Sequence, residues 1–374
     1  MTLPQANLAD IDDLLARVRQ AAGGAVNQAR GKKKPGRFFN VEDPIVWATL
    51  YDFDANRYYS DARFYFAQNL LQKLWRWETF PDEDSPLNLD VPAWLGHYVE
   101  FTFIGLSVGF TPRGVPIIQT DHPLTRTPDL SLLRPVEFKT SGWIDRMLRW
   151  HEQLSVLAAG RVHVPFAMVW WRGCLDLAVA LRGYENLVAD MVERPQFVHG
   201  LLKWLVEQRC RWYEGYYRHF GLKPSIAYVA DDWINVPFIT PAMFADFVLP
   251  RYLEIEKFHG AIGGVHSCGN QAPVQKYLLE IKSLPGLEVS PWTDLETTLA
   301  NVPPAKNLVV ALHPNDVLIA GRREMENKLT FIRDRCLGRN YTVATSGLTP
   351  LSDDHRRYED SIRMWIEVGN QVLG

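Results

Sequence analysis

The segment Ala261-Ile262-Gly263-Gly264-Val265-His266-Ser267-Cys268-Gly269-Asn270 joins an apolar run to a group of polar residues that ends it. Such a run is typical of a short buried strand. Side chains two residues apart on a strand share a face, so His266 and Cys268 can reach a common point. Imidazole nitrogen and thiolate sulfur are preferred zinc ligands, and catalytic zinc keeps one coordination position open. The segment therefore indicates half of a zinc site, whose other ligands must come from elsewhere.

The residues of this segment leave two interpretations open. His266 and Cys268 can be a zinc pair, or a hydrogen-bonded core histidine beside a small buried residue. The following Gly269 and Asn270 favour the zinc pair, because they suit a tight strand-to-helix turn at a place that a ligand approaches. Asn270 is accordingly a predicted substrate-binding residue.

Short apolar runs alternate with segments of helical period from about residue 160 onward. The predicted strands are 166–171, 226–230, 261–265, 287–290, 308–312 and 341–344. The predicted helical stretches are 185–219, 241–259, 272–283, 294–300, 322–337 and 353–370. This alternation predicts an α/β fold with a parallel sheet, and two further strands before residue 150 would complete a (β/α)8 TIM-type barrel. A doubly wound open sheet is the competing architecture, although no Gly-x-Gly-x-x-Gly follows a strand.

The N-terminal part of the chain has a different pattern. Apolar residues at helical spacing predict helices over 8–22 and 61–77, and the acidic loop 81–86 marks a plausible boundary. We therefore expect an N-terminal helical accessory segment over 1–80 and the barrel over 81–374.

Composition and charge restrict the class of protein. The 374 residues are 47% hydrophobic and 22% charged, as expected for a folded protein, and a net charge of -3 gives no reason to expect nucleic acid or a membrane as partner. Four cysteines without disulfide-framework spacing fit a reducing, cytoplasmic compartment. The N-terminus has neither a basic region nor a long apolar stretch, so no signal peptide or membrane span is predicted. Base rates alone suggest a homodimer.

In a parallel barrel the active site lies at the carboxyl ends of the strands. The polar and aromatic residues that follow predicted strands are Asp231, Asp232, Trp233, His266, Cys268, Trp292, His313 and Ser346. Asp231 and Asp232 are either catalytic or ligating carboxylates or caps of the next element. Only one of two adjacent residues at a strand end faces the barrel axis, and we favour Asp232 for that position. His313 is either a third nitrogen donor or a hydrogen-bonded turn residue.

Four tryptophans lie near predicted strand ends, at positions 170, 171, 233 and 292. Trp170, Trp171, Trp233 and Trp292 can line a pocket for a flat or cationic substrate, and core packing explains each of them equally well. Arg172 is a candidate for holding a substrate carboxylate, as is Lys139 elsewhere in the chain.

From about Pro86 to the C-terminus the chain resembles the uroporphyrinogen decarboxylase-like barrels, and within them the cobalamin-dependent methyltransferases that act on methylated corrinoid proteins. The resemblance rests on 181–183 with Glu185 and Asp190, 194–196, 231–232, 239–241, 247–250, 266–270 and Gly347. It implies a (β/α)8 barrel. In the methyltransferase branch it also implies zinc that activates a thiol acceptor, held by the His-x-Cys pair and a later cysteine near the last strand.

Two departures from the family pattern affect this expectation. Ser346 stands where the later cysteine is expected, and a neutral serine is a poorer zinc ligand than a thiolate. Cys336 does not replace it, because it precedes the last predicted strand, so His313 or an aspartate would have to complete the site. The arginine-rich N-terminal motif of the decarboxylases has no counterpart, which argues against true uroporphyrinogen decarboxylase activity.

Three functions follow as hypotheses. The leading one is a zinc-assisted methyltransferase that moves a methyl group between a corrinoid and either a small methylated substrate or a thiol or folate acceptor, with a corrinoid protein as a possible partner. The second is a decarboxylase of a small aromatic or heterocyclic acid. The third is a catalytically silent barrel that binds a corrinoid or another ligand.

Overall fold

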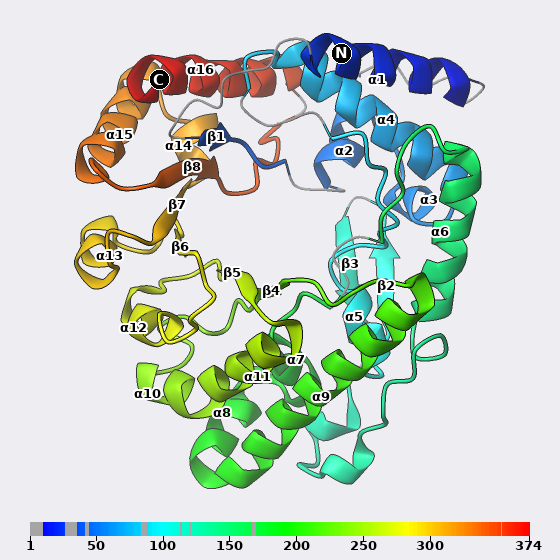
Figure 1. The fold of residues 1–374 in the computed structure, drawn as a ribbon, viewed down its shortest axis with the longest axis vertical. Helices are drawn as coiled ribbons and strands as arrows, with labels where there is room; N and C mark the ends of the chain where they lie inside the picture. Colours follow the sequence, from blue (N-terminus) through cyan, green and yellow to red (C-terminus); the bar gives the residue numbers. More distant parts are fainter. Residues whose placement is uncertain are drawn as a thin grey trace.

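A computed structural model describes most of the chain (Figure 1). The described residues are 10–26, 36–41, 45–83, 88–112, 114–119, 121–166, 170–352 and 354–374. Part of the predicted boundary loop 81–86 and the middle of the predicted strand 166–171 lie outside these residues.

Parallel strands form the centre of the structure. A four-stranded sheet has the order β1-β8-β7-β6, and β4 pairs with β5 in a separate parallel ladder. The parallel strands are β1 (Gly36–Phe38), β4 (Ala227–Ala230), β5 (Ile262–His266), β6 (Gly286–Val289), β7 (Asn307–Leu312) and β8 (Tyr341–Thr345). An antiparallel hairpin consists of β2 (Val108–Thr111) and β3 (Gly114–Ile118). The predicted strands from 226 onward are confirmed to within about one residue, a shift that is usual at element ends.

Single parallel bridges extend this pattern. Arg172 pairs with Ala230 of β4, and Ala93 pairs with Phe166. Figure 1 shows β1, β8, β7, β6, β5 and β4 following one another along a curve. The parallel α/β architecture is confirmed. Hydrogen-bonded pairing among the described residues does not close the strands into a ring, so the (β/α)8 barrel stays a prediction.

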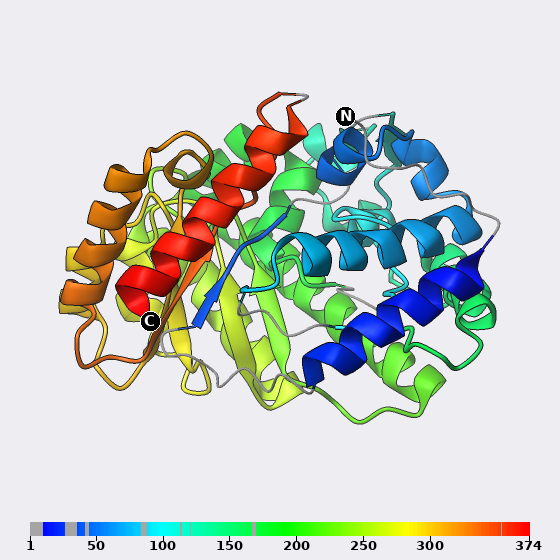
Figure 2. The same ribbon diagram turned by 90° about the horizontal axis from the view of Figure 1, so that it is seen from above.

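Helices cover the outer side of the strands (Figures 1 and 2). The N-terminal helices are α1 (Ile11–Val26), α2 (Ile45–Leu50), α3 (Ala55–Tyr58), α4 (Ala62–Thr79) and α5 (Val99–Phe103). The next are α6 (Ile144–Ala158), α7 (Cys174–Arg182), α8 (Tyr184–Glu193), α9 (Pro195–Phe220), α10 (Pro241–Met243) and α11 (Leu249–His259). The last are α12 (Gln275–Leu278), α13 (Leu295–Asn301), α14 (Asn315–Leu318), α15 (Arg322–Arg335) and α16 (His355–Leu373). Short 3₁₀ turns are η1 (Pro123–Thr125), η2 (Leu130–Leu132) and η4 (Ala272–Val274), and a π-helical turn is η3 (Phe244–Val248).

Two details differ from the sequence-based expectation. The stretch 185–219, predicted as one helical region, divides into α8 and α9 at Arg194, because the residue before a proline is disfavoured in the helical conformation. The segment 1–80, predicted as a helical accessory, also contributes β1, which pairs with β8. Among the described residues, no helix is both long and apolar enough to cross a membrane.

Aromatic side chains occupy much of the core. Tryptophans 47, 75, 94, 150, 170, 212 and 365 are all buried. Trp170 is only 1% exposed and lies 5.7 Å from the ring of Phe103. Of the two interpretations of Trp170, a pocket wall and core packing, this burial favours core packing.

A buried histidine at the end of α11 makes the stability sensitive to acid. Burial, reinforced by the Arg209 charge, lowers the pKa of His259 from 6.5 to about 4 although the Ser225 carbonyl opposes the shift. The unfolded chain takes up a proton at this residue below pH 6.5, whereas the folded chain does not until about pH 4. This difference of about 2.5 pH units removes about 3 kcal/mol of stability as pH falls through that window.

We expect chemical unfolding to show this loss. Between pH 7.5 and pH 5, His259 should account for about 2 kcal/mol of the decrease in unfolding free energy. In a His259→Gln variant the side chain no longer titrates, so the decrease between these two pH values should be smaller by that amount, whatever the variant's stability at pH 7.5. An equal pH dependence in the two proteins would contradict this assignment.

Candidate metal centre

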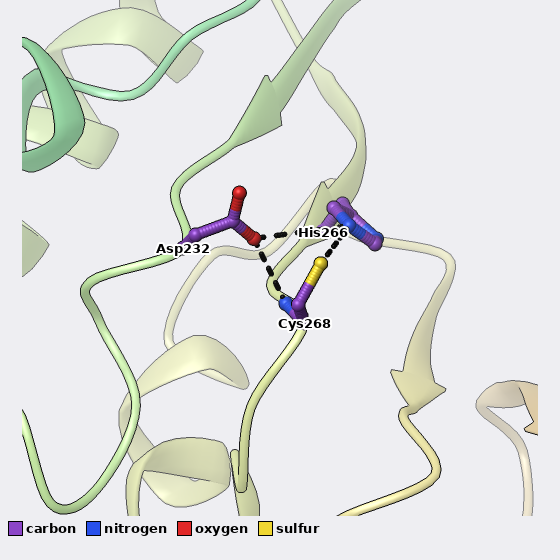
Figure 3. A group of neighbouring side chains, drawn as sticks. All are labelled: Asp232, His266 and Cys268. Atoms are coloured by element: carbon purple, nitrogen blue, oxygen red, sulfur yellow. Dashed lines mark hydrogen bonds and ion pairs between the residues drawn. The ribbon is translucent and has the colours of Figure 1, made fainter. Parts of the chain in front are cut away.

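The carboxyl ends of β4 and β5 bring Asp232, His266 and Cys268 together (Figure 3). Ala230 lies opposite His266 in the parallel ladder, and the Asp231 backbone nitrogen donates to the His266 carbonyl at 2.9 Å. This register places the residue after Asp231 beside the residues that follow β5. Adjacent parallel strands therefore assemble a site whose members are far apart in the sequence.

One ligand atom from each of these three residues lies within 4.8 Å of the other two. His266 Nε2 is 3.3 Å from Cys268 Sγ and 3.9 Å from Asp232 Oδ1. Zinc bonds of about 2.0 to 2.3 Å at tetrahedral angles hold ligand atoms about 3.3 to 3.6 Å apart. The two distances from His266 are thus within a few tenths of an ångström of those in a zinc site, and nitrogen, sulfur and oxygen are all zinc-ligand types.

Glu288 of β6 fixes the orientation of the imidazole. Its Oε2 atom lies 2.7 Å from His266 Nδ1, so the other ring nitrogen, Nε2, faces Cys268. A carboxylate behind a ligating histidine is a common arrangement in metal sites because it sets the tautomer of the ring. Glu288 is the only charged residue in the predicted strand 287–290, a signal that could have identified it from the sequence.

The charges in the cluster favour a protonated imidazole and thiol in the metal-free state. Burial lowers the pKa of His266, but hydrogen bonds to Cys268 and Glu288 outweigh it and raise the value to about 11. The hydrogen bond to His266 lowers the pKa of Cys268, whereas burial and the Asp232 charge raise it and prevail. A metal ion must displace both protons, so metal affinity should increase with pH.

Asp232 stays ionised beside these groups. Burial raises its pKa, but the hydrogen bond from the Cys268 backbone nitrogen and the positive charges of His266 and Arg172 lower it below the usual value. The 2.9 Å bond from this nitrogen ends on Oδ1, the oxygen that faces His266. Asp232 is thus an anionic oxygen donor.

Asp231 has a structural role that excludes it from the cluster. It is completely buried, and its carboxyl group accepts hydrogen bonds from the backbone nitrogens of Leu175 and Asp176 at the start of α7, at 3.0 and 2.9 Å. The Tyr252 hydroxyl donates to it at 3.1 Å. Burial and the neighbouring Asp176 raise the pKa of Asp231 well above its usual range. Its assignment as a catalytic residue is corrected, and the preference for Asp232 agrees with the geometry.

Arg172 is neutralised by carboxylates. Its Nη1 atom lies 2.7 Å from Asp176 Oδ2 and 3.1 Å from Asp232 Oδ2, and its backbone nitrogen donates to the buried Glu100 at 3.1 Å. Burial raises the pKa of Glu100 to about 7 against the opposing charge of Arg172. Asp176 and Glu100 lie in segments that the sequence did not mark as functional.

The other predicted metal donors lie outside the cluster. His313 Nδ1 accepts a hydrogen bond from the Asn315 backbone nitrogen at 3.1 Å, the turn role that was one of its two interpretations, and His313 is not among the grouped donors of the described chain. The Ser346 backbone nitrogen donates to the Leu312 carbonyl oxygen at 2.8 Å, and the hydrogen bonds of the three donors among the described residues go to groups other than its hydroxyl.

The remaining predicted substrate-binding residues are dispersed around the strand ends. Trp171 lies 5.1 Å from the Arg172 guanidinium and 5.8 Å from the His97 ring. Trp233 stacks on Tyr184 with ring centres 4.9 Å apart, and Trp292 is 55% exposed. Asn270 accepts from the Ala272 backbone nitrogen at 3.1 Å, which stabilises the turn after Cys268.

Comparisons with known proteins give a structural result. No protein-family model matches the chain, and no curated protein sequence matches it. Among solved structures, a methyltransferase from Methanosarcina mazei is similar with a TM-score of 0.66 and 14% sequence identity. The match covers 96% of this chain and 99% of that one. Over nearly its whole length, the chain shares the fold of that protein.

Proposed function

We propose that this chain is a methyltransferase in which zinc, held by Asp232, His266 and Cys268, activates the nucleophile. The observation that carries the proposal is the cluster of three donors at the carboxyl ends of neighbouring parallel strands. The fold shared with a methyltransferase supports the reaction class. The exposed Cys268 and half-buried His266 leave the centre open to a substrate.

Each residue around the centre has a distinct task. Cys268 and His266 supply the sulfur and nitrogen donors, Glu288 holds the imidazole, and Asp232 supplies an anionic oxygen. Bound zinc would supply the Lewis acidity that lowers the pKa of a thiol or water in its open position. This donor set replaces the expected second cysteine by Asp232, which keeps the same charge.

The strand order also supports the closed barrel as part of this proposal. The extended segment 91–93 lies parallel to 163–166, and 171–173 lies parallel to β4, which pairs with β5. The strands β6, β7, β8 and β1 then pair in that order. Closure of these segments would put their carboxyl ends around the metal centre, where barrel enzymes place their catalytic groups.

A corrinoid is the proposed methyl donor or acceptor, on the family resemblance of the sequence. In transfer to a thiol, the thiol releases its proton to solvent, a carbon–sulfur bond forms, the cobalt–carbon bond breaks, and its electron pair stays on cobalt. In transfer from a small methylated substrate to the corrinoid, the cobalt–carbon bond forms and the bond between the methyl group and the substrate breaks.

The geometry argues against the decarboxylase. Arg172, the residue expected to hold a substrate carboxylate, already contacts Asp176 and Asp232. Lys139, the other candidate, is exposed in the turn before α6. A substrate carboxylate would have to displace Asp176 or Asp232 from the mostly buried Arg172 guanidinium. Removing that carboxylate from water costs more free energy at a buried site than at the surface.

Metal analysis combined with an assay of methyl transfer tests the proposal. We expect about one zinc per chain, and transfer from methylcobalamin to a small thiol that stops after chelation and returns with added zinc. Loss of the methylcobalamin absorption spectrum and mass spectrometry of the methylated thiol measure turnover. Full activity without metal would contradict the zinc centre, carbon dioxide release from an aromatic acid would favour the decarboxylase, and tight cobalamin binding without turnover would favour a binding protein.

A further inference from the structure

We infer that Asp176 and Arg172 are positioning residues that aim one oxygen of Asp232 at the metal centre; this inference rests on the proposed function. The two oxygens of Asp232 have different partners. Oδ2 accepts from Arg172 Nη1 at 3.1 Å, whereas Oδ1 accepts from the Cys268 backbone nitrogen at 2.9 Å and faces His266.

Asp176 closes a ring of hydrogen bonds around this carboxylate. Its Oδ1 atom accepts from the Asp232 backbone nitrogen at 2.7 Å, and its Oδ2 atom accepts from Arg172 Nη1 at 2.7 Å. The backbone and the side chain of Asp232 are therefore both tied to the same pair. The Asp176 side chain is 4% exposed and that of Arg172 is 13% exposed, so water competes little for these charge-assisted bonds.

The pair itself is anchored to rigid structure. Asp176 belongs to the first turn of α7, and Arg172 forms a parallel bridge to Ala230, the last residue of β4. The buried Glu100 accepts from the Arg172 backbone nitrogen at 3.1 Å. Because these anchors belong to β4, α5 and α7, they hold the Asp232 oxygen in place before a metal ion arrives.

This arrangement should make zinc affinity depend on residues that do not touch the metal. Loss of a group that orients a ligand commonly costs about 10- to 100-fold in metal affinity. We expect that loss for Asp176→Ala and for Arg172→Met. A smaller loss is expected for Arg172→Lys, because one nitrogen bridges both carboxylates and a lysine ammonium can replace a single nitrogen. Asp176→Asn should also be milder, since it keeps an acceptor for the Asp232 backbone nitrogen.

A matched control separates positioning from general stability. Asp190 on α8 is equally buried and accepts from Arg182 and Arg194 at 2.7 and 2.6 Å, yet it lies outside the metal cluster. Asp190→Asn should lower the melting temperature without changing zinc affinity.

Competition for zinc between each variant and a chromophoric chelator, with a melting curve for each, is the deciding measurement. A 10- to 100-fold loss for Arg172→Met, partly recovered in Arg172→Lys and absent in Asp190→Asn, supports the inference. Wild-type zinc affinity in folded Asp176→Asn and Arg172→Met overturns the inference. A loss of zinc affinity that parallels the fall in melting temperature in every variant, including Asp190→Asn, also overturns it. Absence of zinc binding by the wild-type protein overturns the proposed function as well.

Discussion

Replacement of Cys268 by alanine should abolish stoichiometric zinc binding and reduce methyl transfer by more than about 100-fold. Loss of a group behind a metal ligand already costs about 10- to 100-fold, and Cys268 is itself a donor, 3.3 Å from the His266 nitrogen. Only the oxygen of Asp232 and the nitrogen of His266 would remain as donors, and zinc would lose the sulfur ligand that it favours. Metal analysis after gel filtration and the methylcobalamin assay measure the two losses.

Cys210 provides the matched control for this experiment. It lies on α9 outside the donor cluster, and burial raises the pKa of its thiol to about 11, so it is a poor metal ligand at neutral pH. Cys210→Ala should keep zinc and activity. Retention of zinc and activity by folded Cys268→Ala would exclude the proposed centre, whereas equal losses in both cysteine variants would point to a general effect of removing a thiol.

The strands of the second half were predictable because each includes a short apolar run in the sequence. In β7 the run 308–312 is continuously apolar, although only Leu308, Val310 and Leu312 are buried in the structure. The strand β1 was missed because three residues are too few to show any period. Its position is determined by pairing with β8, a contact between distant parts of the chain.

The candidate site was predictable only in part, for a related reason. His266 and Cys268 are two residues apart, so a local rule placed them together. Their third partner, Asp232, depends on the register of β4 against β5, and no local pattern decides between it and Asp231. Glu288 and Asp176 come from β6 and α7, and their roles exist only after the strands have assembled.

Strand-end position alone did not decide between the two interpretations of His313, a metal donor or a turn residue. It follows β7, as the sequence indicated, but its imidazole accepts from the Asn315 backbone nitrogen and forms part of a turn. A residue type that suits a metal site is also suited to turn formation, because its ring nitrogen can accept a hydrogen bond from the backbone. Side-chain direction after a strand end is set by that turn and not by the strand period.

Replacement of Asp231 by alanine should destabilise the fold by about 4 kcal/mol or more. Its carboxyl group satisfies the backbone nitrogens of Leu175 and Asp176 and the hydroxyl of Tyr252, all in a completely buried place. Each buried donor left without a partner costs about 1 to 3 kcal/mol, and loss of a helix cap contributes within that range. A domain stabilised by about 5 to 15 kcal/mol loses a large fraction of its stability by such a change.

Two neighbouring substitutions make this result specific. Asp231→Asn keeps one oxygen acceptor for the start of α7 and should be much less destabilising than Asp231→Ala. Asp232→Ala removes a half-buried carboxylate from the proposed metal centre, so zinc affinity should fall more than the unfolding free energy. Denaturant unfolding and chelator competition on the three variants give both quantities. The opposite pattern, with Asp231→Ala stable but unable to bind zinc, would exchange the roles assigned to the two aspartates, since only their positions relative to β5 and α7 distinguish them.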